Sequence, residues 1–182
     1  MKRCGIILIM AVFLGGCNNK VVVEENPLPN EEIVGDEINY GEQMPQVEAL
    51  AAISFKPKRL SGDNSPFSIR KETAILNKTN KPSEIIELGY GGHGHSITLI
   101  VENETELNKD IALEWDNSLK YEEILLENGG NALYGEGEHS HHILWVENGL
   151  SYFMALRYKG GVSPAPERYS KSEVMKIVNN LE

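Results

Sequence analysis

The chain has almost no cysteine. Of its 182 residues only Cys4 and Cys17 are cysteines, and both precede the part of the sequence whose patterns are globular. The folded part is therefore expected to have no disulfide framework, no thiolate metal site and no cysteine nucleophile. Its stability must come from packing, for which 41% hydrophobic residues is an ordinary content.

Basic residues are also scarce. The chain has 17 lysines and arginines against 27 aspartates and glutamates, which gives a formal net charge of -10. Nucleic acids and anionic lipid surfaces are bound chiefly through lysine and arginine side chains. The composition therefore argues against both as partners of the folded part.

Signatures of catalysis are missing as well. There is no Gly-x-Ser-x-Gly nucleophile elbow, and Ser96 and Ser140, which adjoin histidines, show no other sign of activation. The glycine-rich stretch 89–94 precedes a predicted strand rather than a helix, which argues against nucleotide binding. Residues 110–116 lack the ligand spacing of a calcium loop. We therefore expect a protein that is not an enzyme.

What the sequence does contain begins at its N-terminus. Lys2 and Arg3 precede an apolar run at residues 5–14, which has the length of a signal peptide and is too short to span a bilayer. The run ends in Leu-Gly-Gly-Cys (residues 14–17), which resembles the lipobox of bacterial lipoproteins. The resemblance implies a signal peptide at residues 1–16 and a diacylglyceryl lipid on Cys17. The alternative is an ordinary cleaved signal followed by a chance cysteine.

The next segment differs in composition from the rest. Residues 17–46 are rich in Asn, Glu and Pro, which predicts a flexible acidic tether between the membrane and one folded domain at residues 47–182. Residues 21–23, three valines, could instead form a short edge strand. The expected location is the extracytoplasmic face of the cell membrane, where the domain is held by lipid.

The domain shows the patterns of an α+β fold. Residues 47–53 predict a short helix. Seven β-rich runs separated by turn residues predict an antiparallel β-meander: 67–76, 84–90, 96–102, 121–127, 131–134, 143–147 and 150–158. Near the end, Ser170 and Glu173 form a capping box, and apolar residues follow at helical spacing. We expect this C-terminal amphipathic helix to pack on the sheet.

Three turns fix the expected pairing of strands. Asn148-Gly149 is a strong two-residue turn signal, and it places Trp145 opposite Tyr152 in a hairpin that is apolar on both faces. Such a hairpin is expected at the centre of the sheet, with both of its faces covered.

The other two turn signals are Asn128-Gly129 and Gly91-Gly92. If Gly91 and Gly92 form the turn, Tyr90 lies opposite His93, and His95 shares a face with the apolar residues of its strand. These histidines would then lie at the rim of the apolar face.

Three motifs together suggest a family. They are Phe-Lys-Pro-Lys-Arg-Leu at residues 55–60, the Trp145-x-x-x-Gly149-x-x-Tyr152 hairpin, and the closing helix at residues 170–181. In this order they resemble the bacterial domain of unknown function 4367, over about residues 50–182. The resemblance implies a secreted, lipid-anchored or membrane-tethered protein with a curved antiparallel sheet, distantly like lipoprotein-carrier and envelope-stress sensor domains. It supplies no activity and no catalytic residue.

The histidines form the sharpest candidate site. All five fall in two clusters, and those of metal-ligand spacing are His93, His95, His139 and His141. Residues i and i+2 of a strand share a face, so each cluster could supply a chelating pair for Zn or Cu, with Glu136 or Glu138 as a further ligand. The alternatives are a solvated loop and a pH-responsive histidine patch.

The leading expectation from the sequence is a lipid-anchored cell-surface protein. Its domain would bind or sense without catalysis, with an apolar ligand or a protein partner on the concave side of the sheet. The alternative is a lipoprotein that binds Zn or Cu through its histidine clusters. A metallohydrolase that uses the same clusters is the third possibility.

Overall fold

The computed structural model describes residues 41–78, 83–160 and 166–182. The expected signal peptide, Cys17 and most of the expected tether lie outside these residues. The elements are β1 (Gln43–Met44), α1 (Gln46–Ala52), β2 (Lys71–Lys78), β3 (Glu84–Gly91), β4 (His95–Glu102), α2 (Lys109–Trp115), β5 (Tyr121–Leu125), β6 (Asn131–Glu136), β7 (Ser140–Glu147), β8 (Leu150–Tyr158) and α3 (Lys171–Asn179). None of these helices is long and apolar enough to cross a membrane.

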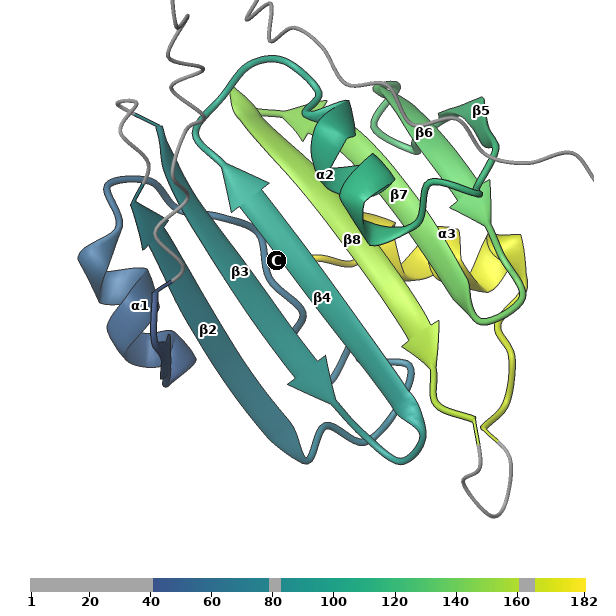
Figure 1. Ribbon diagram of the computed structural model, residues 1–182, viewed down its shortest axis with the longest axis horizontal. Helices are drawn as coiled ribbons and strands as arrows, with labels where there is room; N and C mark the ends of the chain where they lie inside the picture. Colours follow the sequence, from purple (N-terminus) through teal and green to yellow (C-terminus); the bar gives the residue numbers. More distant parts are fainter. Residues whose placement is uncertain (1–40, 79–82, 161–165) are drawn as a thin grey trace, which may run out of the picture. The chain divides into compact units, whose positions relative to one another are not determined.

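The strands form one open antiparallel sheet in the order β1-β2-β3-β4-β8-β7-β6-β5 (Figure 1). An antiparallel sheet with a C-terminal helix is thus confirmed, but it is not a single meander. Two meanders, β1 to β4 and β5 to β8, meet where β4 pairs with β8. Strands β4 and β8 carry apolar residues on both faces and therefore occupy the centre, whereas β5, with Glu122 and Glu123, lies at an edge.

Both faces of the sheet carry a core. Helices α1 and α3 contribute Ala49, Val174, Ile177 and Val178 to the larger cluster on one face. Helix α2 lies on the opposite face, where Ala112 joins a smaller cluster with residues that include Leu144 and Phe153. Figure 1 shows α2 in front of the sheet and α3 behind it. The expectation that the β7–β8 hairpin is central and covered on both faces is confirmed.

The β7–β8 hairpin has the predicted register. Asn148 and Gly149 have φ angles of 53° and 78°, as a two-residue turn between twisted strands requires. Trp145 pairs with Tyr152, and their rings stack with centroids 4.8 Å apart. The α3 capping box is also present, because Ser170 Oγ accepts a hydrogen bond from the Glu173 main-chain N–H, and the Glu173 side chain accepts one from the Ser170 N–H.

The predicted turn at Gly91-Gly92 is wrong. Gly91 pairs with Ser96, and the turn is made by His93 and Gly94, of which Gly94 has a φ of 74°. Position 92 requires glycine for a reason other than a turn. A Cβ there would lie 2.4 Å from the Phe67 ring and 2.8 Å from the Ser68 carbonyl oxygen. The turn therefore lies two residues further along the chain than predicted. His95 still shares a face with the apolar residues of its strand, as predicted.

Three further features differ from expectation. The turn containing Asn128-Gly129 is a longer loop, closed by the Leu126 N–H donating to the Gly130 carbonyl at 2.8 Å. The fold begins before residue 47, because β1 and the start of α1 fall within the expected tether. Helix α2 was not predicted, since only seven residues form it and it is fixed by tertiary contact: the Trp115 ring packs edge-on against Phe153.

Candidate functional site

The first histidine cluster divides between solvent and the core. His93 is exposed in the β3–β4 turn, whereas His95 is half-buried on β4. Nδ1 of His95 lies 3.0 Å from the His93 carbonyl oxygen, and Nε2 lies 2.8 Å from the Glu167 carbonyl oxygen. The His95 ring also stacks on Phe67. Main-chain oxygens therefore face both ring nitrogens of His95.

The second cluster divides in the same way. His139 precedes β7, so the i, i+2 relation of a strand does not hold for it, and its side chain is 63% exposed beside Glu138. His141 lies on the larger core, where its Nδ1 is 2.8 Å from the Tyr134 hydroxyl oxygen. Burial is the main cause that lowers the pKa of His141 below its usual value.

His142 is the most enclosed of the five histidines and lies on the opposite face of the sheet. It has no exposed area, its Nδ1 is 3.0 Å from the Tyr121 hydroxyl oxygen, and its ring packs edge-on against Phe153. Its Nε2 is buried without a hydrogen-bond partner. Burial first, and the nearby Arg157 guanidinium second, lower its pKa to about 4. His142 is therefore neutral at pH 7.

The two clusters meet at one aromatic ring but do not gather as a ligand set. The rings of His95 and His141 both lie edge-on to Tyr158, each with centroids 5.7 Å apart. His93 and His139 take no part in this contact. Within residues 41–78, 83–160 and 166–182, no group of three His, Cys, Asp or Glu residues could hold a metal ion. The arrangement is that of histidines packed among tyrosines.

Two of the three motifs that suggested a family contact each other. The Lys58 main-chain N–H donates to the Tyr152 hydroxyl at 3.2 Å, and Lys58 Nζ forms an ion pair with Glu147 at 2.8 Å. Leu60 N–H donates to the Tyr90 hydroxyl at 3.2 Å. These contacts attach residues 55–60 to the central hairpin and to β3. Trp145 and Tyr152 are buried in the larger core, and Gly149 forms the turn of the hairpin, so the three residues of this motif have structural positions.

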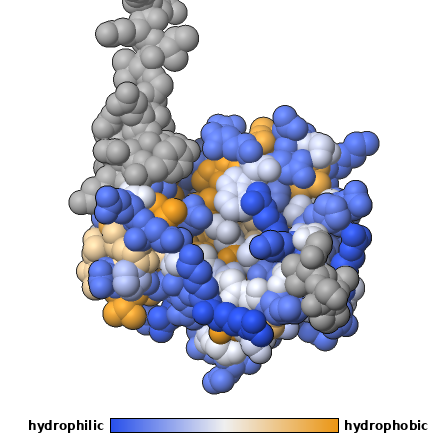
Figure 2. All heavy atoms as spheres, turned by 60° about the horizontal axis from the view of Figure 1, so that its bottom comes forward, coloured by the Kyte–Doolittle hydropathy of each residue, from blue (hydrophilic) through white to orange (hydrophobic). Residues whose placement is uncertain are grey.

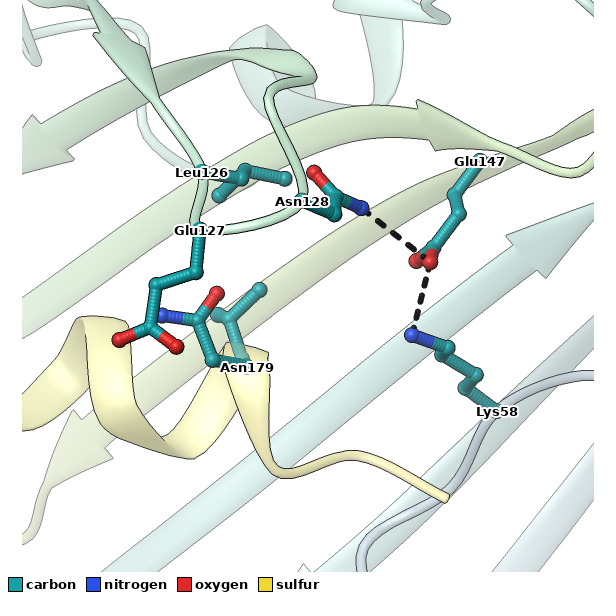
Figure 3. A pocket seen from close by; sticks show the side chains of 7 residues that line it. Lys58, Leu126, Glu127, Asn128, Glu147 and Asn179 are labelled. Atoms are coloured by element: carbon teal, nitrogen blue, oxygen red, sulfur yellow. Dashed lines mark hydrogen bonds and ion pairs between the residues drawn. The ribbon is translucent and has the colours of Figure 1, made fainter.

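The Lys58–Glu147 ion pair lines a pocket of about 290 Å³ (Figure 3). The Glu147 carboxylate also accepts from Asn128 Nδ2 at 3.2 Å and from Trp145 Nε1 at 3.4 Å. Burial alone would raise the pKa of Glu147, but the hydrogen bond and charge of Lys58 outweigh it and hold that pKa below its usual value. The Glu147 carboxylate therefore has its hydrogen-bond partners within the fold, and its role is structural.

A groove shares lining residues with this pocket. The groove has a volume of about 540 Å³ and lies between α3 and the end of β5, where Leu125, Met175, Lys171 and Lys176 line it. Glu127 and Asn179 border both hollows. Leu125 is 69% exposed. We call this hollow the β5–α3 groove. No pattern in the sequence marked it, because it joins segments about fifty residues apart.

Comparison of the chain with protein-family models, curated proteins and solved structures gives no match. The site must therefore be interpreted from its own residues.

Proposed function

We propose that this protein is a lipid-anchored lipoprotein of the cell envelope whose domain binds another protein without catalysis. The anchor rests on the signal-like run at residues 5–14 and the small residues before Cys17. The resemblance of the domain to the family of unknown function 4367 is part of the same proposal. It rests on the motifs at residues 55–60, 145–152 and 170–181.

One observation carries the choice of a protein partner. Side chains fill the face of the sheet that α1 and α3 cover, and Ile86, Ile143 and Trp145 there have no exposed area. A face packed in this way has no room for a buried apolar ligand. The β5–α3 groove is instead open, and both apolar and charged side chains line it. This combination suits a polypeptide better than a lipid chain.

The surface agrees with this proposal. In Figure 2 hydrophilic atoms dominate the side of the molecule turned forward, and hydrophobic atoms occupy small areas among them. Among the described residues, the large hydrophobic side chains that are exposed lie on three different elements: Val47 on α1, Leu113 on α2 and Leu125 on β5. Of these three, only Leu125 borders a described groove. We therefore assign the β5–α3 groove as the contact surface for the partner protein.

A non-catalytic role is supported by the state of the titratable groups. His141 and His142 are buried against aromatic rings, out of reach of a substrate. His93 and His139 are exposed and lack an orienting carboxylate within hydrogen-bond distance among the described residues. These positions favour roles in packing and solvation.

Two measurements test the proposal. The Cys17→Ser variant should leave the membrane fraction and appear in the soluble fraction, and it should lose the mass of a lipid. A photo-crosslinking amino acid at Leu125 should attach an envelope protein, whereas the same residue at Glu72, on the opposite side of the sheet, should not. Retention of Cys17→Ser in the membrane would refute the anchor. Equal crosslinking from both positions would refute the assigned surface.

A further inference from the structure

The two edges of the sheet are protected differently. At one edge, β1 pairs with Ala74 and Ile75 of β2, and Gln46 at the start of α1 donates to the Thr73 carbonyl oxygen at 3.3 Å. At the other edge, β5 pairs with β6 on one side, and no described strand lies on its other side. The outer main-chain groups of β5 therefore have no strand partner among the described residues, and an edge of this kind can pair with a further strand.

The groove adjoins this open edge. Leu125, at the end of β5, and Met175, on α3, both line it, and Met175 also packs against the larger core. A strand added to β5 would send alternate side chains to opposite faces of the sheet. One set would lie on the α3 face of the sheet and enter the groove beside Met175, while the other set would lie on the opposite face, which carries Glu123 and Leu125.

The charges on β5 indicate which side chains of the added strand should lie on the face that carries Glu123. Glu122 is already paired with Lys171 of α3, at 2.7 Å between carboxylate oxygen and Nζ. Glu123 is exposed, has no ion-pair partner among the described residues, and shares a face with Leu125. A lysine or arginine directly opposite Glu123 would complete a favourable cross-strand pair. Glu127 adds a second carboxylate at the same end of the groove.

The same charges argue against a second copy of the chain. Antiparallel pairing of two β5 strands about their centre would bring Glu122 or Glu123 of one copy opposite an identical carboxylate of the other. Like charges in directly opposite positions destabilise a strand pair. Each copy also carries a net charge of -10, which opposes self-association at low salt.

We propose that β5 accepts an extended peptide segment of a partner protein as an added strand of the sheet. The segment alternates apolar side chains, which occupy the β5–α3 groove, with lysine or arginine side chains, one of which pairs with Glu123. Main-chain hydrogen bonds to β5 supply affinity, and the groove and Glu123 supply selectivity. This inference rests on the proposed function, since it names the kind of partner that the binding module takes.

The experiment uses the full-length chain in a non-ionic detergent and three short capped peptides. One alternates valine and lysine, one alternates valine and glutamate, and the third is the valine–lysine peptide interrupted by proline, which cannot pair as a strand. We expect the valine–lysine peptide to bind in calorimetry, more tightly than the other two. In hydrogen exchange it should slow the amides of Tyr121–Leu125 and leave those of β2 unchanged.

Glu123→Lys should reverse the preference between the two charged peptides and weaken binding of the valine–lysine peptide by about fivefold to tenfold. Glu72→Lys makes the same charge change on β2 and is the matched control, for which affinity should stay at the wild-type value. Met175→Ser should weaken binding of both charged peptides without changing the preference between them.

Several outcomes would overturn the inference. They are equal binding of all three peptides, protection away from β5, or equal effects of Glu123→Lys and Glu72→Lys. Wild-type dimers in sedimentation that Glu123→Lys abolishes would assign the edge to a second copy instead. If the chain crosslinks an envelope protein through Leu125 yet binds none of the peptides, the proposed function stands and only the inference of strand addition fails.

Discussion

The Trp145 and Tyr152 rings stack at 8° to one another across β7 and β8, with both side chains buried. The Tyr152 hydroxyl extends beyond the stack and accepts a hydrogen bond from the Lys58 main-chain N–H. One aromatic pair therefore joins the central hairpin to residues 55–60, which lie about ninety positions earlier in the chain.

Two substitutions at Tyr152 should separate these contributions. Tyr152→Phe removes only the hydroxyl, and we expect it to lower the free energy of unfolding by about 1 kcal/mol. Tyr152→Ala also removes the stack and leaves a cavity, with an expected loss of about 3–5 kcal/mol. Urea denaturation followed by tryptophan fluorescence measures both values. Equal losses for the two variants would show that the ring contact contributes nothing beyond the hydroxyl.

The ion pair of Lys58 with Glu147 should stabilise the same junction. Both side chains are less than one-third exposed, so Lys58→Met, which keeps most of the stem, is expected to cost about 1 kcal/mol. Because the folded pKa of Glu147 is lowered, this contribution is present above the ordinary glutamate pKa and is lost as pH falls through the folded pKa. Denaturation of both proteins at neutral and acidic pH should show their stabilities converging in acid.

His142 should make the fold sensitive to mild acid. Its pKa is about 4 in the folded chain and about 6.5 in the unfolded chain, so the unfolded state binds the proton first. Its contribution is present above pH 6.5 and is lost progressively as pH falls toward 4, by about 3 kcal/mol in total. Removing the titratable group in His142→Gln should flatten the stability curve over this range, although the variant is less stable at pH 7.

The exposed His93 provides the control for that measurement. His93→Gln should keep the wild-type dependence of stability on pH, because no buried group is removed. If His142→Gln and His93→Gln gave the same curve, burial of His142 would not be the cause of the acid sensitivity.

Metal titration provides a separate check on the histidines. Carbonyl oxygens face both nitrogens of His95, and Nδ1 of His141 faces the Tyr134 hydroxyl, so a metal would have to break these contacts. We expect calorimetry with Zn and Cu to show no tight one-to-one binding, and we expect His93→Ala and His139→Ala to leave the thermograms unchanged. If a metal binds stoichiometrically and the double variant His139→Ala/His141→Ala abolishes this binding, the hypothesis of a histidine metal site is correct.

The sequence predicted local features well where a single turn or cap determines them. The Asn148-Gly149 turn allows only one register, so the pairing of Trp145 with Tyr152 followed from counting outward. The α3 capping box was equally local. By contrast, Gly92 is required by the close approach of Phe67, a contact with a segment outside the hairpin, so the two adjacent glycines were misread as the turn.

The features that the sequence could not predict depend on distant contacts. Which strand lies beside β4 depends on the packing of the whole sheet, and this also decides where the histidine clusters meet. The β5–α3 groove is formed by two segments that carry no shared motif. Placement of Cys17 and of the tether up to residue 40 lies outside the described residues, so the lipid anchor stays a prediction.

The pairing of β4 with β8 determines when the sheet can be completed during synthesis. Strand β8 is the last of the described strands to be synthesised, and until it arrives β4 has an open edge in the middle of the future sheet. The first meander alone would expose the apolar face of β4, so it gains its full stability only when the second meander joins it. A chain made in this order stays incomplete until its final strand emerges. This property suits the export that we propose for this chain, because it keeps the sheet incomplete until synthesis has passed β8.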